Sequence, residues 1–193
     1  MPPSEHMADA PEPKTIHLAA NAVLLLIGAS GSGKSTFAAR HFPAEAVISS
    51  DRHRGLIAGD ESDQGANDAV FERMHQLVEE RAAAGLLAVV DATNTRGPAR
   101  SELGWHAHRH NRPLVAIALS LPVETCLQRN AARARPVPTR VIRQQVADLR
   151  HLEADLELEG YAAVHVFRSE AEVEAARILI DGEADPSPCR PLC

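Results

Sequence analysis

The sequence predicts a doubly wound α/β domain, in which helices cover both faces of a layer of parallel strands. Two observations lead to this fold class. Short apolar runs without polar alternation recur along the chain, as expected for parallel strands that are buried on both faces. Between these runs, apolar residues recur at the i, i+3/i+4 spacing of amphipathic helices. Because strands and helices alternate through 193 residues, we expect one domain and not several.

Five apolar runs are predicted to form the strands. They are residues 22–27, 46–49, 86–90, 114–119 and 162–167. Two stripes of apolar side chains at helical spacing predict helices between them. The first stripe contains Val70, Met74, Leu77 and Val78 and stops at Gly85, and the second contains Val141, Ile142, Val146, Leu149 and Leu152.

Composition sets the domain boundaries and the class of protein. Residues 1–16 and 181–193 are rich in proline and acidic residues, so we expect a flexible arm and tail around a domain at 17–180. The net charge of −6 argues against a broad electrostatic grip on nucleic acid. No apolar stretch approaches about 18 residues. We therefore expect a cytoplasmic protein, in which the cysteine at position 126 is a small core residue.

A glycine-rich segment follows the first apolar run and precedes a predicted helix. Its pattern, G-x(4)-G-K-[ST], is that of a P-loop (Walker A). Glycines allow successive backbone N–H groups to turn inward around phosphate oxygens, Lys34 reaches the β- and γ-phosphates, and the Ser35 hydroxyl binds Mg²⁺. The residues predicted to bind ATP·Mg²⁺ are Gly28, Ala29, Ser30, Gly31, Ser32, Gly33, Lys34, Ser35 and Thr36.

Two further strands are followed by acidic residues at the edge where open α/β sheets bind ligands. Asp51 follows the run at 46–49, and Asp91 follows the run at 86–90. A kinase needs one carboxylate near Mg²⁺, directly or through water, and another to orient or deprotonate the attacking hydroxyl. Two candidates favour a phosphotransferase over a plain ATPase, although spacing alone leaves open which carboxylate has which role. Arg54, three residues after Asp51, can hold an anionic acceptor, or it can be a solvated charge at the start of a helix.

An arginine-bearing segment after the fourth strand is predicted to form a lid at about residues 128–145. Arg129 and Arg133 are four residues apart, so both side chains project from one helix face. Arg135 precedes a proline-interrupted loop that leads to Arg140. Mobile arginines of this kind can stabilise the charge on a phosphoryl group during its transfer.

Two polar clusters remain. His106 and His110 are also four residues apart, but no cysteine stands near them in the sequence. We interpret the segment as a solvated, histidine-rich helix end and not as a metal site. The loop at 60–64 can approach a substrate, but a polar loop before a helix needs no function.

Taken together, these segments resemble the kinase module of bacterial polynucleotide kinase–phosphatases and the wider zeta-toxin-like group of P-loop kinases. The resemblance covers about residues 18–178. It rests on the P-loop, the Ile-Ser-Ser-Asp at 48–51 followed by Arg54, the loop at 60–64, the Val-Asp-Ala-Thr-Asn at 90–94, and the cysteine at 126 followed by Arg129 and Arg133.

The resemblance implies a parallel sheet of order 2-3-1-4-5 and transfer of the ATP γ-phosphate to the 5′-OH end of RNA or DNA. It makes Asp51 the general base and Lys34 and the lid arginines the other catalytic groups. It places Arg54, Asp91 and Asn94 on the substrate side. Two alternatives stay open. The acceptor can be a small hydroxyl compound, such as a nucleoside, sugar or antibiotic, or the chain can be a nucleotide-dependent ATPase or switch module.

Overall fold

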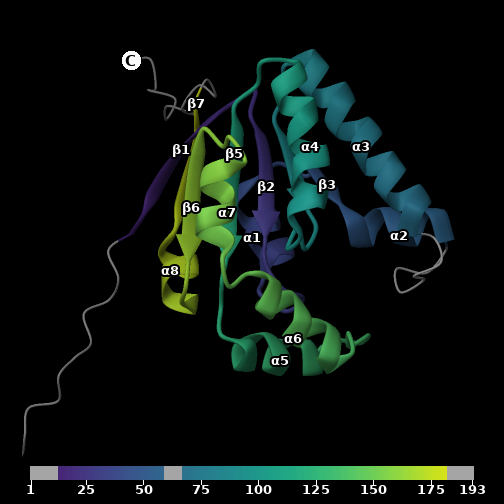
Figure 1. Cartoon of the computed structure of the whole chain (residues 1–193), viewed down its shortest axis with the longest axis vertical. Helices are drawn as coiled ribbons and strands as arrows, with labels where there is room; N and C mark the ends of the chain where they lie inside the picture. The colour runs from purple at the N-terminus through teal and green to yellow at the C-terminus, as the bar shows by residue number, and fades with distance from the viewer. Residues whose placement is uncertain (1–12, 59–66, 182–193) are drawn as a thin grey trace, which may run out of the picture.

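The computed structural model describes residues 13–58 and 67–181, and the loop at 60–64 lies outside these residues. A five-stranded parallel sheet forms its centre, in the order β3-β4-β2-β5-β6 (Figure 1). The strands are β2 (Val23–Ile27), β3 (Val47–Ser49), β4 (Ala88–Asp91), β5 (Leu114–Leu119) and β6 (Ala163–Phe167). Numbered within the sheet this order is 2-3-1-4-5, which confirms the predicted fold class and topology.

Helices cover both faces of the sheet, as the alternation of patterns predicted. Their bounds are α1 (Lys34–His41), α2 (Ser50–Ala58), α3 (Asn67–Ala84), α4 (Gly97–Arg109), α5 (Val123–Ala131), α6 (Thr139–Asp148), α7 (Leu152–Leu158) and α8 (Glu170–Ala175). One core cluster joins α3, α4 and α7 to the sheet, and the other joins α1 to its opposite face. Every residue of β2 is fully buried between them, which explains the absence of polar alternation there.

The second predicted helix stripe is divided between two helices. The chain leaves α6 after Asp148 and begins α7 at Leu152. Ile142 packs into a small cluster near the P-loop, whereas Leu149 and Leu152 pack into the main core under α3 and α4. The apolar spacing therefore continues across the break between α6 and α7, although the two parts of the stripe pack into different core clusters.

Two strands were not predicted. β1 (Thr15–Ala19) and β7 (Arg177–Asp181) pair in parallel as a separate two-stranded sheet, which packs on the α1 side of the domain. The expected arm at 1–16 and tail at 181–193 therefore overlap these strands at their inner ends. In β1, buried Ile16 and Leu18 alternate with exposed neighbours. This pattern is too short to recognise without knowledge of its partner at the other end of the chain.

Helices α5 and α6 lie beyond the carboxyl ends of the strands, apart from the layers that cover the sheet (Figure 1). They contain the segment predicted as a lid. A small apolar cluster of Ala29, Leu121, Cys126 and Ile142 attaches them to the P-loop. In the described part of the chain, none of the helices is both long and apolar enough to cross a membrane.

Candidate functional site

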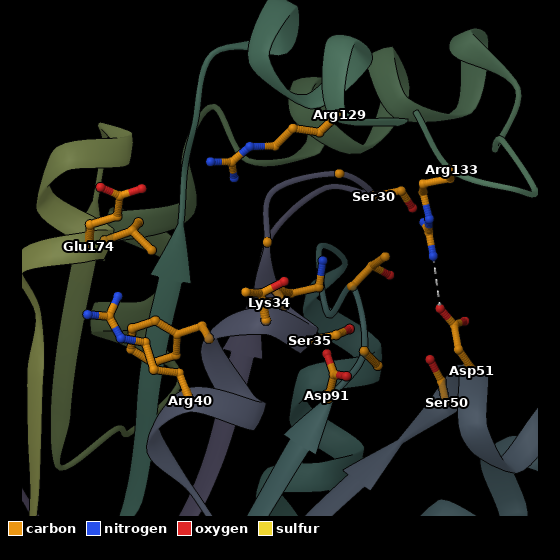
Figure 2. Close-up of a pocket in the computed structure, with 17 residues that line it drawn as sticks. Ser30, Lys34, Ser35, Arg40, Ser50, Asp51, Asp91, Arg129, Arg133 and Glu174 are labelled. Carbon is orange, nitrogen blue, oxygen red and sulfur yellow. Dashed lines mark ion pairs between the residues drawn. The ribbon is translucent and has the colours of Figure 1, made fainter. Parts of the chain in front are cut away.

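A cavity of about 480 Å³ opens at the carboxyl edge of the sheet, between the P-loop, α1, the ends of β3 and β4, and the lid helix α5 (Figure 2). It brings together most of the residues that were predicted from the sequence. Those that line it are Ser30, Gly31, Gly33, Lys34, Ser35, Thr36, Asp51, Asp91, Arg129 and Arg133. Gly28, Ala29 and Ser32 contribute to the loop behind it.

The P-loop conformation requires glycine at two positions. Gly31 and Gly33 have φ angles of 87° and 97°, in the left-handed region that side chains rarely adopt. A Cβ atom on Gly31 would also lie 2.2 Å from the backbone oxygen of Cys126 in α5. The loop is therefore enclosed by backbone on its lid side as well as on its sheet side.

The ammonium group of Lys34 is buried inside this loop. Its Nζ donates to the backbone oxygens of Gly28 at 2.8 Å and Ala29 at 2.9 Å. Desolvation lowers the pKa of Lys34 to about 8, against an opposing contribution from the Asp91 carboxylate. A cation held in this way by carbonyl oxygens can exchange them for phosphate oxygens.

Asp91 is the last residue of β4 and is almost completely buried. Its carboxylate, the Ser35 hydroxyl and the Asp51 carboxylate line the same cavity, so the available donors are all hard oxygen atoms. The described residues include no group of three or more His, Cys, Asp or Glu that could form a dedicated metal cage. Mg²⁺ in nucleotide sites takes only one or two carboxylates beside the phosphates, and this donor set fits it.

Asp51 lies in the first turn of α2, one residue beyond the point where β3 meets the helix. Its Oδ1 accepts a hydrogen bond from Arg54 Nη1 at 2.8 Å, and its Oδ2 lies 3.5 Å from Arg133 Nη2 of the lid segment (Figure 2). The side chain is 47% exposed, so these ion pairs contribute little to stability. Their main effect is to fix the carboxylate between its own helix and the lid.

The two lid arginines reach different parts of the cavity. Arg129 Nη1 donates to the backbone oxygen of Ser32 at 3.3 Å, and its Nη2 lies 3.3 Å from Glu170 of α8. Arg133 points instead towards Asp51 (Figure 2). The prediction that both side chains project from one helix face is wrong, because α5 ends at Ala131 and Arg133 lies beyond the C-cap of the helix. Both side chains still line the cavity, Arg129 over the P-loop and Arg133 beside Asp51.

A second cavity of about 600 Å³ adjoins the first and shares Ser30, Ser50, Asp51, Ala92, Thr93 and Arg133 with it. Beyond the shared wall its lining is Arg54, Phe71, Arg135, Pro136, Val137, Pro138, Arg140, Val141 and Gln145. Among the described residues, four arginines and one carboxylate, that of Asp51, face this space, and their net positive charge favours anions. Sequence reasoning missed Phe71 and Gln145, because nothing in the pattern of α3 or α6 distinguishes them.

Asn94 does not line either cavity. Its side chain is buried, and its Nδ2 donates to the backbone oxygen of Leu26 in β2 at 2.8 Å. Its φ angle is 47°, a left-handed conformation that asparagine tolerates better than most residues. The structure therefore places Asn94 behind the site, where it connects the end of β4 to β2.

The interpretation of His106 and His110 as a solvated helix end is wrong. His106 Nδ1 and His110 Nε2 lie 2.7 and 2.8 Å from the carboxylate of Glu79 in α3, and the side chain of His106 is mostly buried. The two hydrogen bonds lower the pKa of Glu79 to about 2, and the bond from His110 has the larger effect. The acidic partner was missed because it comes from another helix. The cluster joins α3 to α4 and lines neither cavity.

Solved structures with a similar fold include several kinases. A chain of the Pnkp1/Rnl/Hen1 RNA repair complex is 23% identical, with a TM-score of 0.57 over 72% of this chain and 46% of that one. A sugar kinase from Janibacter sp. is 19% identical, with a TM-score of 0.51 over 76% and 84%. A chain of the PezAT toxin–antitoxin system of Streptococcus pneumoniae is 14% identical, with a TM-score of 0.54 over 76% and 66%. At identities this low, these similarities show a common fold.

The chain spans less than half the length of the matched chain from the RNA repair complex. No curated protein matches the sequence. The model of one sequence family, described as an AAA domain, matches residues 23–152, from the first residue of β2 to the first residue of α7. This match covers most of the sheet, the P-loop and the lid helices. The chain therefore belongs to the AAA domain family AAA_33 and has the fold of a P-loop kinase.

Proposed function

We propose that the protein is an ATP-dependent phosphotransferase that moves the γ-phosphate to the hydroxyl group of an anionic acceptor, the 5′-OH end of RNA or DNA. One observation carries this proposal. Asp51 lies in the wall between the two cavities and lines both of them. The cavity at the P-loop is the donor cavity, and the arginine-lined cavity beside it is the acceptor cavity. A hydroxyl placed at Asp51 would meet the donor phosphate.

In the donor cavity, backbone N–H groups of the P-loop bind the ATP phosphates and Lys34 exchanges its carbonyl contacts for phosphate oxygens. Ser35 would hold Mg²⁺, with Asp91 or Asp51 acting through water. When bound, this ion neutralises charge on the phosphates. Arg129 lies over the P-loop backbone, where it can stabilise charge on the phosphoryl group during transfer.

On the acceptor side, Asp51 is the general base. Its carboxylate takes the proton of the acceptor hydroxyl while the hydroxyl oxygen forms a bond to the γ-phosphorus and the bond to the ADP oxygen breaks. The hydrogen bond from Arg54 orients the carboxylate. Arg133 contacts Asp51, and during transfer it would exchange this contact for the transferred phosphoryl group.

The charge of the acceptor cavity supports a polynucleotide end over a neutral compound. Arg54, Arg135 and Arg140 lie beyond the wall that it shares with the donor cavity. A phosphodiester beside the reacting hydroxyl would meet this concentration of positive charge, whereas a neutral sugar or nucleoside would gain nothing from it. The structural neighbours do not choose between these acceptors, since one belongs to an RNA repair complex and another is a sugar kinase.

Incubation with γ-labelled ATP and a panel of acceptors tests the proposal. The panel contains 5′-OH RNA, 5′-OH DNA, nucleosides and sugars. We expect label at the oligonucleotide end. Label on small molecules alone would support the small-acceptor alternative, and release of free phosphate alone would support the ATPase or switch alternative.

A further inference from the structure

Arg100, in the first turn of α4, is the largest of the described side chains that are fully buried. Its guanidinium group is bound by the Glu159 carboxylate, from Nε to Oε2 at 2.9 Å and from Nη2 to Oε1 at 2.6 Å. The remaining nitrogen, Nη1, donates to the backbone oxygen of Asn94 at 3.0 Å. A buried cation requires such partners, because removing a charge from water is costly unless hydrogen bonds and an opposite charge replace the lost hydration.

The loop that receives this hydrogen bond runs from Asp91 to Asn94. On its other side it is attached to β2 and the P-loop, because Asn94 Nδ2 donates to Leu26 and Gly28 N donates to the Thr93 oxygen at 2.9 Å. Asn94 is in the left-handed region, with a φ angle of 47°, and contacts on both sides hold this conformation. Arg100 provides the contact on the side away from the P-loop.

Every residue of this loop before Asn94 faces a cavity. Asp91, Ala92 and Thr93 line the donor cavity, and Ala92 and Thr93 also line the acceptor cavity. Glu159 directly follows α7, the first helix after the lid helices. The Arg100–Glu159 pair thus connects the loop that bears Asp91 to the segment by which the chain returns from the lid.

Stability alone is a weak reason for this pair. Replacement of a buried ion pair by apolar residues of similar volume is often neutral or stabilising. The third hydrogen bond also goes to the site loop and not to another part of α4 or α7. A group that fixes the Asn94 carbonyl fixes the peptide units before it, which place the Asp91 carboxylate.

We propose that Arg100 is a positioning residue for the nucleotide-bound Mg²⁺: through the Asn94 carbonyl it holds the Asp91 carboxylate in place, and Glu159 holds Arg100. This inference rests on the donor half of the proposed function, ATP binding with Mg²⁺ assisted by Asp91, and is independent of the acceptor. Groups that hydrogen-bond a metal ligand directly change metal affinity by about 10–100-fold when they are replaced, and we expect Arg100, which acts through the backbone of the same loop, to lie near the lower end of that range.

The test measures ATP affinity by calorimetry, with Mg²⁺ and with EDTA, in the parent protein and in Arg100→Lys. Lysine keeps the charge, but its ammonium group cannot reproduce the guanidinium hydrogen bonds to Glu159 and to Asn94 at the same time. We expect the gain in affinity from Mg²⁺ to fall by about tenfold or more, while the affinity in EDTA changes by less than about threefold. Arg112→Lys is the matched control, because Arg112 Nε donates to the Ala82 oxygen at 2.8 Å, at the other end of α4.

The double variant Arg100→Met/Glu159→Leu separates positioning from stability. It removes the pair without leaving a buried charge, so we expect its melting temperature to stay near that of the parent while the Mg²⁺-dependent gain is still lost. An unchanged gain in this folded variant would overturn the proposal, and so would an equal loss in Arg112→Lys. Failure of transfer to every acceptor would leave this result intact, whereas absence of ATP binding by the parent would refute both proposals.

Discussion

The donor and acceptor sides of the site are built in different ways. The donor side is made of buried backbone, with Lys34 enclosed by the carbonyl oxygens of its own loop. The acceptor side consists of long arginine side chains from α2 and the lid, around an Asp51 side chain that is about half exposed. The phosphate-binding loop of the donor side is thus one continuous segment, while the acceptor side forms only where distant segments come together. Variants should affect the two sides separately.

The largest expected effect comes from Asp51, which lies in the wall between the donor and acceptor cavities. Asp51→Asn should lower phosphate transfer by about 10²–10⁴-fold, because the general base is lost, and should leave ATP affinity nearly intact. Single-turnover transfer and an ATP dissociation constant, measured on the same preparation, check this. Asp155→Asn, at an exposed carboxylate of α7, is the control. Transfer close to that of the parent would refute the assignment and direct attention to Asp91.

The next largest effect should come from the enclosed P-loop. Gly31→Ala adds a Cβ atom that meets backbone of α5, whereas the corresponding atom in Gly33→Ala meets only the end of the Arg129 side chain, at 3.0 Å. Both positions have positive φ, which costs about 1–3 kcal/mol for alanine. We expect both variants to melt at lower temperature, with the larger loss in Gly31→Ala. Equal losses of melting temperature would show that contact with the α5 backbone does not restrict position 31.

Substitution of the two lid arginines should distinguish the donor side of the site from the acceptor side. Arg129→Ala should weaken ATP binding by roughly tenfold, since it removes a charged group from above the P-loop. Arg133→Ala should have a smaller effect on ATP binding and act mainly on the rate of transfer, because its contact is Asp51. Steady-state KM for ATP and kcat distinguish the two. An identical pattern in both variants would contradict the division of roles.

ATP affinity should depend on pH through Lys34. Its ammonium form binds phosphate, and in the free protein the pKa is lowered to about 8 by burial. As the pH rises above about 8 the group is neutral before ATP binds, so affinity should fall by up to about tenfold per pH unit. Calorimetric titrations from pH 7 to 9 measure this. Lys34→Arg, which stays charged, should bind with no such dependence.

The smallest effect concerns the histidine cluster away from both cavities. The pKa of Glu79 is about 2 in the folded protein, below its ordinary value, so its contribution to stability is complete above pH about 4.5 and is lost as the pH falls towards 2. Glu79→Gln should lower the melting temperature at pH 6 by less than about 4 °C. This difference should shrink below pH 4.5. Nucleotide affinity should not change.

The features that could be predicted from the sequence are those that neighbouring residues define. Each of the five sheet strands and the P-loop is defined by neighbouring residues, whose apolar runs or fixed spacing reveal local structure. Asp51 and Asp91 could be found because each stands at or just beyond the carboxyl end of a strand. The predicted topology came from resemblance, and the structure confirms it.

What was missed depends on partners far apart in the chain. Glu79 meets His106 from another helix, β1 pairs with β7 across nearly the whole chain, and Arg100 meets Glu159 on the far side of the lid. Side-chain partners of this kind are set by tertiary packing and leave no periodic signal in the sequence. The same reasoning applies to Phe71, which becomes a wall of the acceptor cavity only when α3 packs beside α2.

The most direct test of an anionic acceptor compares a nucleoside with its 3′-phosphate. Both compounds present the same 5′-hydroxyl to Asp51, and only the second offers an anion to Arg54, Arg135 and Arg140. We predict a kcat/KM at least about tenfold higher for the 3′-phosphate, with the advantage reduced by salt. Equal or better use of the neutral nucleoside would contradict the account.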